Sequence, residues 1–141
     1  MKYKIVFLSN GFLYDSHCQV NGTLVQQYNL SQALSKRRIQ VHYVCTTNDL
    51  LKPDFEKIDN LNIHWIRNKS KFLVWKKTIS CYEKKLSEIK PDAVYVRGRS
   101  VLQYVASKYC KKYSKKYIWA TNGTDGVEFW KSTKHLLFSN K

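Results

Sequence analysis

The 141-residue sequence is poor in the residues that break regular structure. It has five glycines and two prolines, so long irregular segments are not expected. Its four cysteines lie at least 27 positions apart and form no Cys-x-x-Cys pair, which excludes the usual zinc and redox spacings. No apolar run approaches the roughly 18 residues of a membrane span, and the run behind the basic start is too short for a signal peptide.

Acidic residues are also scarce. Ten Asp and Glu stand against 25 Lys and Arg, giving a formal net charge of +15. Such a balance favours contact with polyanions, namely nucleic acid, anionic lipid headgroups or phosphorylated substrates. Because the lysines are spread along the chain rather than clustered, ordinary solubility explains the charge equally well.

The remaining composition is that of a globular domain. Hydrophobic residues make up 43% of the chain, aromatic residues 14% and charged residues 25%. A chain of this length suits one domain and can bury roughly 68–70% of its unfolded surface. Cys45 and Cys110 fall on faces expected to be in the core, and we expect reduced thiols in the cytosol.

Short apolar runs alternate with helical patterns along the chain. The runs predict strands at residues 4–9, 40–46, 61–67, 92–97 and 116–120, and a polar connection at 47–60. The helical patterns cover residues 23–37, 72–89 and 101–113, with a last amphipathic piece at 127–138. Strands and helices that alternate with short connections predict an α/β fold, a single domain with a doubly wound, Rossmann-like parallel sheet.

The helical patterns also predict which faces are buried. The strongest stripe has a spacing of three and four residues and consists of Phe72, Trp75, Ile79, Tyr82, Leu86 and Ile89. In the first helix we expect the buried face to hold Leu24, Tyr28, Leu30, Ala33 and Leu34. Thr23 lies in the expected cap region of that helix, and Ser100 is placed to cap the third helix.

No standard nucleotide-binding or metal-binding motif is found. The dinucleotide fingerprint Gly-x-Gly-x-x-Gly is missing after the first strand, and so is the P-loop lysine motif. His42, His64 and His135 are interpreted as structural or exposed. We therefore predict no metal and no cofactor.

Polar residues instead follow three of the predicted strands. Because the carboxyl ends of parallel strands meet at one edge, these loops should converge on one site for a sugar or phosphate. The candidate binding residues are Asn10, Gly11, His17, Asn21, Gly22, Arg97, Gly98, Arg99, Asn122 and Asp125. The alternative for each is simpler: turn glycines, a solvated loop histidine and ordinary surface arginines.

Two segments resemble the family 4-type glycosyltransferases. The first strand, a long loop ending in Asn21-Gly22 and the segment LSQALSKRRIQV at residues 30–41 resemble the opening of that family. The segment KPDAVYVR at residues 90–97 resembles its entry to the fourth strand. The likeness covers nearly the whole chain. It departs at Asn21 and at Arg38-Ile39, where the family has glycine and glycine-histidine, and it transfers no catalytic histidine.

The resemblance implies that residues 1–141 form one half of a GT-B fold. In this family the N-terminal Rossmann-like domain binds the acceptor, and a C-terminal domain, absent here, binds the nucleotide sugar. The chain would therefore act as an enzyme only when completed by a donor domain. By the same resemblance, backbone at Gly22 would lie close to the donor phosphates in the closed form.

The expected function is the acceptor side of sugar transfer from a nucleotide sugar to a glycan or lipid-linked acceptor, in a truncated or split form that is inactive alone. Two alternatives remain open: a non-catalytic subunit that recruits acceptor for a separate donor-domain chain, and a basic nucleic-acid-binding domain. The catalytic residues are not identified. We expect a cytoplasmic protein that can lie peripherally on the anionic inner face of a membrane.

Overall fold

The fold is a six-stranded sheet with helices on both faces. The computed structural model describes residues 2–16, 18–67, 74–98 and 100–121. In chain order the elements are β1 (Lys4–Ser9), α1 (Gly22–Lys36), β2 (Gln40–Thr47), β3 (Phe55–Ile58), β4 (Leu61–Arg67), α2 (Val74–Ile89), β5 (Ala93–Arg97), α3 (Val101–Tyr113) and β6 (Lys116–Ala120). The predicted α/β, doubly wound, Rossmann-like class is confirmed.

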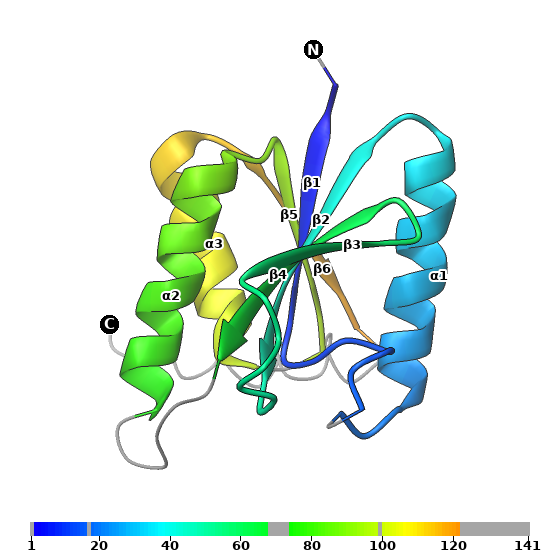
Figure 1. Cartoon of the computed structure of the whole chain (residues 1–141). Coiled ribbons are helices and arrows are strands. Elements are labelled where there is room, and N and C mark those ends of the chain that lie inside the picture. The colour runs from blue at the N-terminus through cyan, green and yellow to red at the C-terminus, as the bar shows by residue number, and fades with distance from the viewer. Residues whose placement is uncertain (1, 17, 68–73, 99, 122–141) are drawn as a thin grey trace.

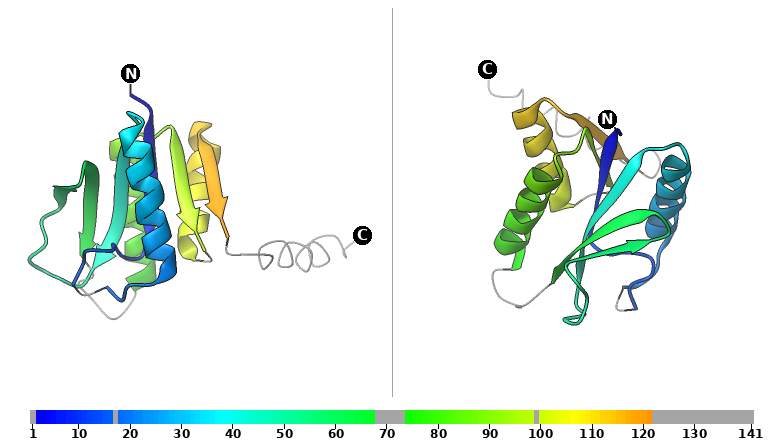
Figure 2. Two further views of the ribbon diagram at one scale, coloured as in Figure 1. Left: turned by 90° about the vertical axis from the view of Figure 1, so that its right-hand side faces the viewer. Right: turned by 45° about the horizontal axis from the view of Figure 1, so that its top comes forward.

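The strand order is β3-β4-β2-β1-β5-β6, so the first strand of the chain lies inside the sheet. β1 pairs in parallel with β2 on one side and with β5 on the other. Helix α1 covers one face of the sheet, and α2 and α3 cover the other (Figures 1 and 2). The strongly apolar β1 therefore contributes to both layers of the core, with Val6 and Leu8 toward α2 and α3 and Ile5 and Phe7 in the other layer.

The five predicted strands are parallel to one another, but a sixth strand was not predicted. β3 lies inside the segment expected to be a polar connection and pairs antiparallel with β4. Its sequence is FEKI, in which two of the four residues are charged and the Phe55 side chain is exposed. Such a composition is typical of a short edge strand and gives little apolar signal. A two-residue turn at Asp59 and Asn60, with φ of 49° and 66°, joins it to β4.

Helix α1 packs on the sheet with much of the predicted face, since Tyr28 and Leu34 lie against the core. Leu24 is buried, but Leu30 is 39% exposed, and the buried positions of the helix include the polar Gln27 and Ser31. Ala33 is exposed as well. The buried face therefore combines predicted apolar residues with the polar Gln27 and Ser31, while the predicted positions Leu30 and Ala33 lie outside it.

The cap of α1 also differs from the prediction. Asn21, not Thr23, is the N-cap residue, and its Oδ1 accepts a hydrogen bond from the backbone N–H of Leu24 at 3.0 Å. Ser100 caps α3 as predicted, accepting from the N–H of Leu102 at 3.2 Å. Both helices thus begin with a side-chain cap at the same edge of the sheet, where β1 and β5 end.

The predicted stripe on α2 packs as expected where the structure describes it. Tyr82, Leu86 and Ile89 are buried and Ile79 packs beside them. Phe72, the side chain of Trp75 and the predicted piece at 127–138 lie outside the described residues. Cys45 and Cys110 are buried, as predicted. Among the helices that are described, none has the length and apolar character needed to cross a bilayer.

Two histidines form a buried pair on β2 and β4. His42 Nδ1 and His64 Nε2 lie 2.9 Å apart, and the two rings are stacked with centroids 5.2 Å apart. Burial, followed by repulsion from His64 and Lys4, lowers the pKa of His42 to about 4. Burial and Lys85 also lower the pKa of His64, against the opposing pull of Glu88. The predicted structural role of both histidines agrees with this geometry.

The histidine pair should make folding stability fall in acid. Because the pKa of His42 drops from 6.5 to about 4 on folding, the unfolded chain binds more protons than the folded one between these values. Stability is then complete above about pH 6.5 and decreases toward pH 4, by at most about 3 kcal/mol from this group. Urea unfolding across this range should give a shallower pH slope for His42→Gln than for wild type. An unchanged slope would contradict the assignment.

Candidate functional site

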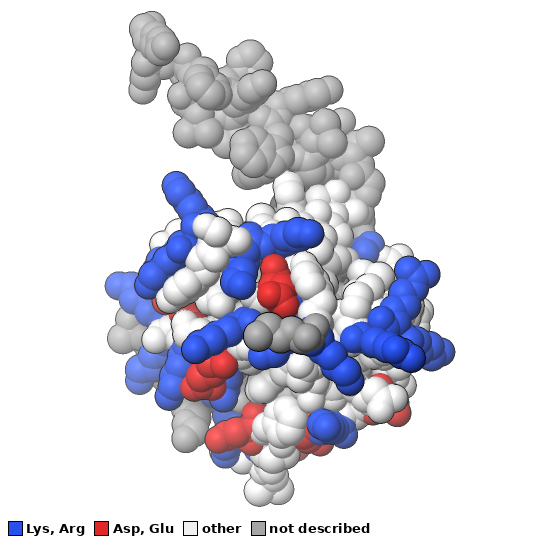
Figure 3. All heavy atoms as spheres, turned by 90° about the horizontal axis from the view of Figure 1, so that it is seen from above, with Lys and Arg blue, Asp and Glu red and all other residues white. Residues whose placement is uncertain are grey.

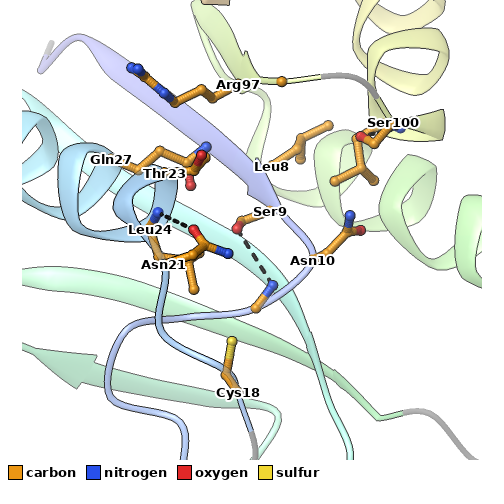
Figure 4. Close-up of a pocket in the computed structure, with 13 residues that line it drawn as sticks. Leu8, Ser9, Asn10, Cys18, Asn21, Thr23, Leu24, Gln27, Arg97 and Ser100 are labelled. Carbon is orange, nitrogen blue, oxygen red and sulfur yellow. Dashed lines mark hydrogen bonds between the residues drawn. The ribbon is translucent and has the colours of Figure 1, made fainter. Parts of the chain in front are cut away.

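A pocket of about 200 Å³ lies at the edge where β1 and β5 end. Its walls come from the loop after β1, the first turn of α1 and the turn between β5 and α3. Figure 4 shows Asn21 and Thr23 of α1, Arg97 of β5 and Ser100 of α3 placed around Ser9 and Asn10. Three chain segments that are distant in sequence therefore meet here, as expected from parallel strands.

The end of β1 is held from below by α2. The hydroxyl of Tyr82, a fully buried side chain of that helix, donates to the carbonyl oxygen of Ser9 at 2.5 Å. Thr46 Oγ1 at the end of β2 donates to the carbonyl of Asn10 at 2.7 Å. Side chains of two elements, α2 and β2, thereby hold the backbone that enters the pocket, which preorganises the start of the loop.

The turn after β5 requires glycine. Gly98 has φ of 77°, a left-handed conformation in which a side chain would be strained. Its carbonyl accepts from Gln103 Nε2 at 2.8 Å and from Trp119 Nε1 at 3.1 Å, and its N–H donates to the carbonyl of Ala120 at 2.9 Å. These bonds hold the turn in place between Arg97 and the cap of α3.

The pocket favours a ligand with negative charge or many hydroxyl groups. Two capped helices, α1 and α3, point their positive N-terminal ends toward it. Among its described lining residues Arg97 is the charged one, and no Asp or Glu lines it. The other polar side chains are hydroxyls and amides, which suit the hydroxyl groups of a sugar.

Gln27 is an unexpected member of this pocket. It lies in the second turn of α1, is 2% exposed, and lines the pocket with Thr23. Its Oε1 atom has no hydrogen-bond partner among the described residues. A buried acceptor without a partner costs free energy, so a ligand hydroxyl that donates to it would be bound favourably.

A neighbouring pocket of about 170 Å³ shares Asn10 and Cys18 with the first and also contains the buried Asp15. Burial, and then the charge of Asp15, raise the pKa of the Cys18 thiol. The thiol is therefore protonated at neutral pH and is not a ready nucleophile. Within the described part of the chain, no three His, Cys, Asp or Glu side chains gather as metal ligands do.

The structure brings half of the predicted site residues together. Asn10, Gly11, Asn21, Arg97 and Gly98 line the first pocket. Gly22 lies between two lining residues, and a Cβ there would meet no atom within 4 Å. His17, Arg99, Asn122 and Asp125 lie outside the described residues.

Gln27 and Cys18 were not among the predicted site residues. Gln27 escaped prediction because it is polar, although it lies on the same helix face as the predicted Leu24 and Leu34. A polar residue three positions after the buried Leu24 was the one available signal, since residues three apart share a helix face. No comparable signal marked Cys18.

Comparison with known proteins defines the class. The chain is similar in structure to the sucrose-phosphate synthase of Thermosynechococcus elongatus, with a TM-score of 0.65 at 12% identity, over 92% of this chain and 35% of that one. It is also similar to the UDP-GlcNAc 2-epimerase of Methanocaldococcus jannaschii, with a TM-score of 0.53 at 18% identity, over 84% and 31%. At these identities the likeness shows the fold alone, one Rossmann-like half of a GT-B architecture. The chain spans about a third of either protein.

The sequence itself identifies the family. The profile of the "Glycosyl transferase 4-like" family matches residues 4–140, so the chain belongs to this family. The predicted resemblance is thereby confirmed. No curated protein matches the chain.

Close packing in the first loop gives a prediction about its two glycines. A Cβ at Gly11 would clash with Cys18 Sγ, whereas a Cβ at Gly22 meets open space. Gly11→Ala should therefore lower the unfolding free energy by about 1–3 kcal/mol, and Gly22→Ala should change it by less than about 0.5 kcal/mol. Urea unfolding measures both.

A double variant tests the cause. Replacing Cys18 by alanine removes the sulfur and leaves Cys18 Cβ as the nearest atom, at an ordinary 3.5 Å from the new methyl group. Gly11→Ala combined with Cys18→Ala should regain most of the loss measured against Cys18→Ala alone. If the double variant is as unstable as the two single effects added together, the Gly11–Cys18 contact is not the cause.

Proposed function

We propose that this chain is the acceptor-side domain of a glycosyltransferase, which transfers a sugar from a nucleotide-sugar donor to a glycan or lipid-linked acceptor once a donor-binding domain completes it. The observation that supports this most is the pocket at the ends of β1 and β5, lined by hydroxyls, amides and Arg97 beneath two helix N-termini. The family assignment supports sugar transfer as the general chemistry.

The pocket supplies binding and positioning rather than a proton-transfer group. Its described lining holds no carboxylate and no histidine. Arg97 and the first turns of α1 and α3 would stabilise negative charge that develops on a departing phosphate. Gln27 Oε1 would accept from an acceptor hydroxyl and help to orient it. In this proposal the donor site itself belongs to the other domain.

Substitutions at Gly22 can test the proposed function without a large effect on folding. In a two-domain enzyme made by joining this chain to a donor domain of the same family, Gly22→Val should abolish transfer, because its side chain would occupy space needed by the donor phosphates. The thermal midpoint should change little, since nothing lies within 4 Å of that position. Gly22→Ala, with a smaller side chain, is the matched control and should keep part of the activity.

The isolated chain gives the complementary test. Purified residues 1–141 should neither hydrolyse nor transfer from any nucleotide sugar, measured by release of nucleoside diphosphate. Turnover by the isolated chain, or full activity of Gly22→Val in the completed enzyme, would each contradict the proposal.

We further propose that the domain associates peripherally with anionic membrane surfaces, where a lipid-linked acceptor would be found. The +15 net charge supports this, since each Lys or Arg near an anionic surface contributes about 1 kcal/mol. Exposed Leu50 and Leu51, at 60% and 93%, could enter the headgroup layer. In vesicle flotation the chain should bind anionic but not neutral liposomes, and binding should weaken at high salt. Equal binding to both would contradict an electrostatic association.

A further inference from the structure

A third pocket, of about 390 Å³, lies at the opposite edge of the sheet, where the parallel strands begin. Gln40 opens β2, Asn62 lies at the start of β4, and both line it. Lys2, Arg38 and Lys57 line it as well, and no Asp or Glu does. The pocket is thus cationic and is separated from the site at the strand ends by the length of the sheet.

The three cations reach this pocket from different parts of the chain. Lys2 precedes β1, Arg38 follows α1, and Lys57 lies on β3 opposite Asn62. None of them forms a salt bridge within the described part of the chain. A positive residue after a helix is common because it balances the helix dipole, but that explanation covers Arg38 only. The three charges therefore remain available to an anion that enters the pocket.

The same edge is basic over a wider area. Viewed onto this edge, many Lys and Arg side chains are distributed around the visible surface, with fewer acidic groups between them (Figure 3). Two carboxylates adjoin lining residues in sequence, and neither lines the pocket. Asp59 accepts a hydrogen bond from the hydroxyl of Tyr28 at 2.6 Å, and Glu56 accepts one from Trp65 Nε1 at 2.5 Å. The field at the pocket therefore attracts small anions.

Hydrogen bonds fix one wall of this pocket. Gln32 Nε2 donates to the carbonyl of Asp59 at 3.1 Å, and together with the Tyr28 bond this ties the β3–β4 turn to α1. The turn presents Asn60, with φ of 66°, to the pocket. The wall is therefore formed before any ligand binds, which reduces the entropic cost of binding.

The other wall contains an arginine in a left-handed conformation. Arg38 has φ of 64° and sits one residue beyond the C-cap of α1. Its N–H donates to the carbonyl of Ser35 at 3.2 Å, and the N–H of Ile39 donates to Leu34 at 3.4 Å. Glycine suits this helix-ending arrangement best, so an arginine here costs stability.

We propose that this pocket binds the phosphate groups of a small phosphorylated molecule. Lys2, Arg38 and Lys57 would neutralise the phosphate, and the amides of Gln40 and Asn60 would donate to its oxygens. The volume lies within the range of small-molecule pockets. The inference does not depend on sugar transfer, because none of these residues belongs to the pocket at the other edge.

Inorganic pyrophosphate is the probe. In a ¹H–¹⁵N titration of the full chain, amide signals of Arg38, Lys57 and Asn60 should shift and saturate, and sodium chloride at matched ionic strength should not reproduce the effect. Lys57→Gln should weaken pyrophosphate binding, raising its dissociation constant about tenfold. Shifts that do not saturate, or that are equal with chloride, would overturn the proposal.

Two glycine variants separate binding from folding. Arg38→Gly and Lys90→Gly each remove one positive charge and each relieve a left-handed residue, at φ of 64° and 52°. Lys90 does not line the pocket. Both variants should raise the thermal midpoint, but only Arg38→Gly should weaken pyrophosphate binding, again about tenfold. Equal affinities for the two variants would contradict a specific pocket.

A lipid headgroup is the other source of the same chemistry. Vesicles of phosphatidylcholine with phosphatidylglycerol should shift the Arg38, Lys57 and Asn60 signals less than pyrophosphate does, and pyrophosphate should still bind in their presence. If these signals respond to the vesicles and not to pyrophosphate, the pocket for a small molecule is overturned.

Discussion

The parallel pairing of β1 with β2 and β5 is the constraint on which the rest of the structure depends. The register runs from Lys4 opposite Gln40 to Ser9 opposite Cys45, and from Ile5 opposite Ala93 to Leu8 opposite Val96. Because all three strands point the same way, the loops that follow β1 and β5 leave at one edge. Tyr82 then fixes the end of β1 from the helical layer beneath. The pocket is a consequence of this arrangement.

The same direction of the strands gives the two edges different electrostatics. Helices that return between parallel strands begin at the edge where strands end, so α1 and α3 point positive N-terminal ends at the first pocket. Their C-terminal ends lie at the other edge, where negative partial charge favours basic side chains such as Lys36, Lys111 and Lys112. One edge thus attracts anions through backbone dipoles, and the other through lysine and arginine.

Much of the fold could be predicted because buried parallel strands are continuous apolar runs. β1, β4 and β6 have the bounds expected from sequence, and β2 and β5 differ by one residue. β3 could not be predicted in the same way, since an edge strand is stabilised by pairing with its neighbour rather than by burial. In α1 hydrophobic periodicity located Leu24, Tyr28 and Leu34 on the core side, but it did not reveal the polar Gln27 and Ser31 that are buried beside them.

From the sequence, we could predict only those pocket residues whose position follows from the order and direction of the strands. Asn10, Asn21 and Arg97 were found because they follow strand ends or begin a helix, and parallel strands bring such positions together. Gln27 also lines this pocket, but a polar residue on a buried helix face gives no apolar signal in the sequence.

The most direct test is hydrogen exchange in a two-domain enzyme made by joining this chain to a donor domain of the same family. Exchange of the backbone amides would be measured with and without a nucleotide sugar. If the proposed function is right, backbone amides in residues 9–24 and 97–102 should exchange more slowly when the nucleotide sugar is present. These two ranges supply most residues that line the pocket at the ends of β1 and β5. Protection absent from both segments, with the nucleotide sugar shown to be bound, would contradict the claim that this edge faces the reaction.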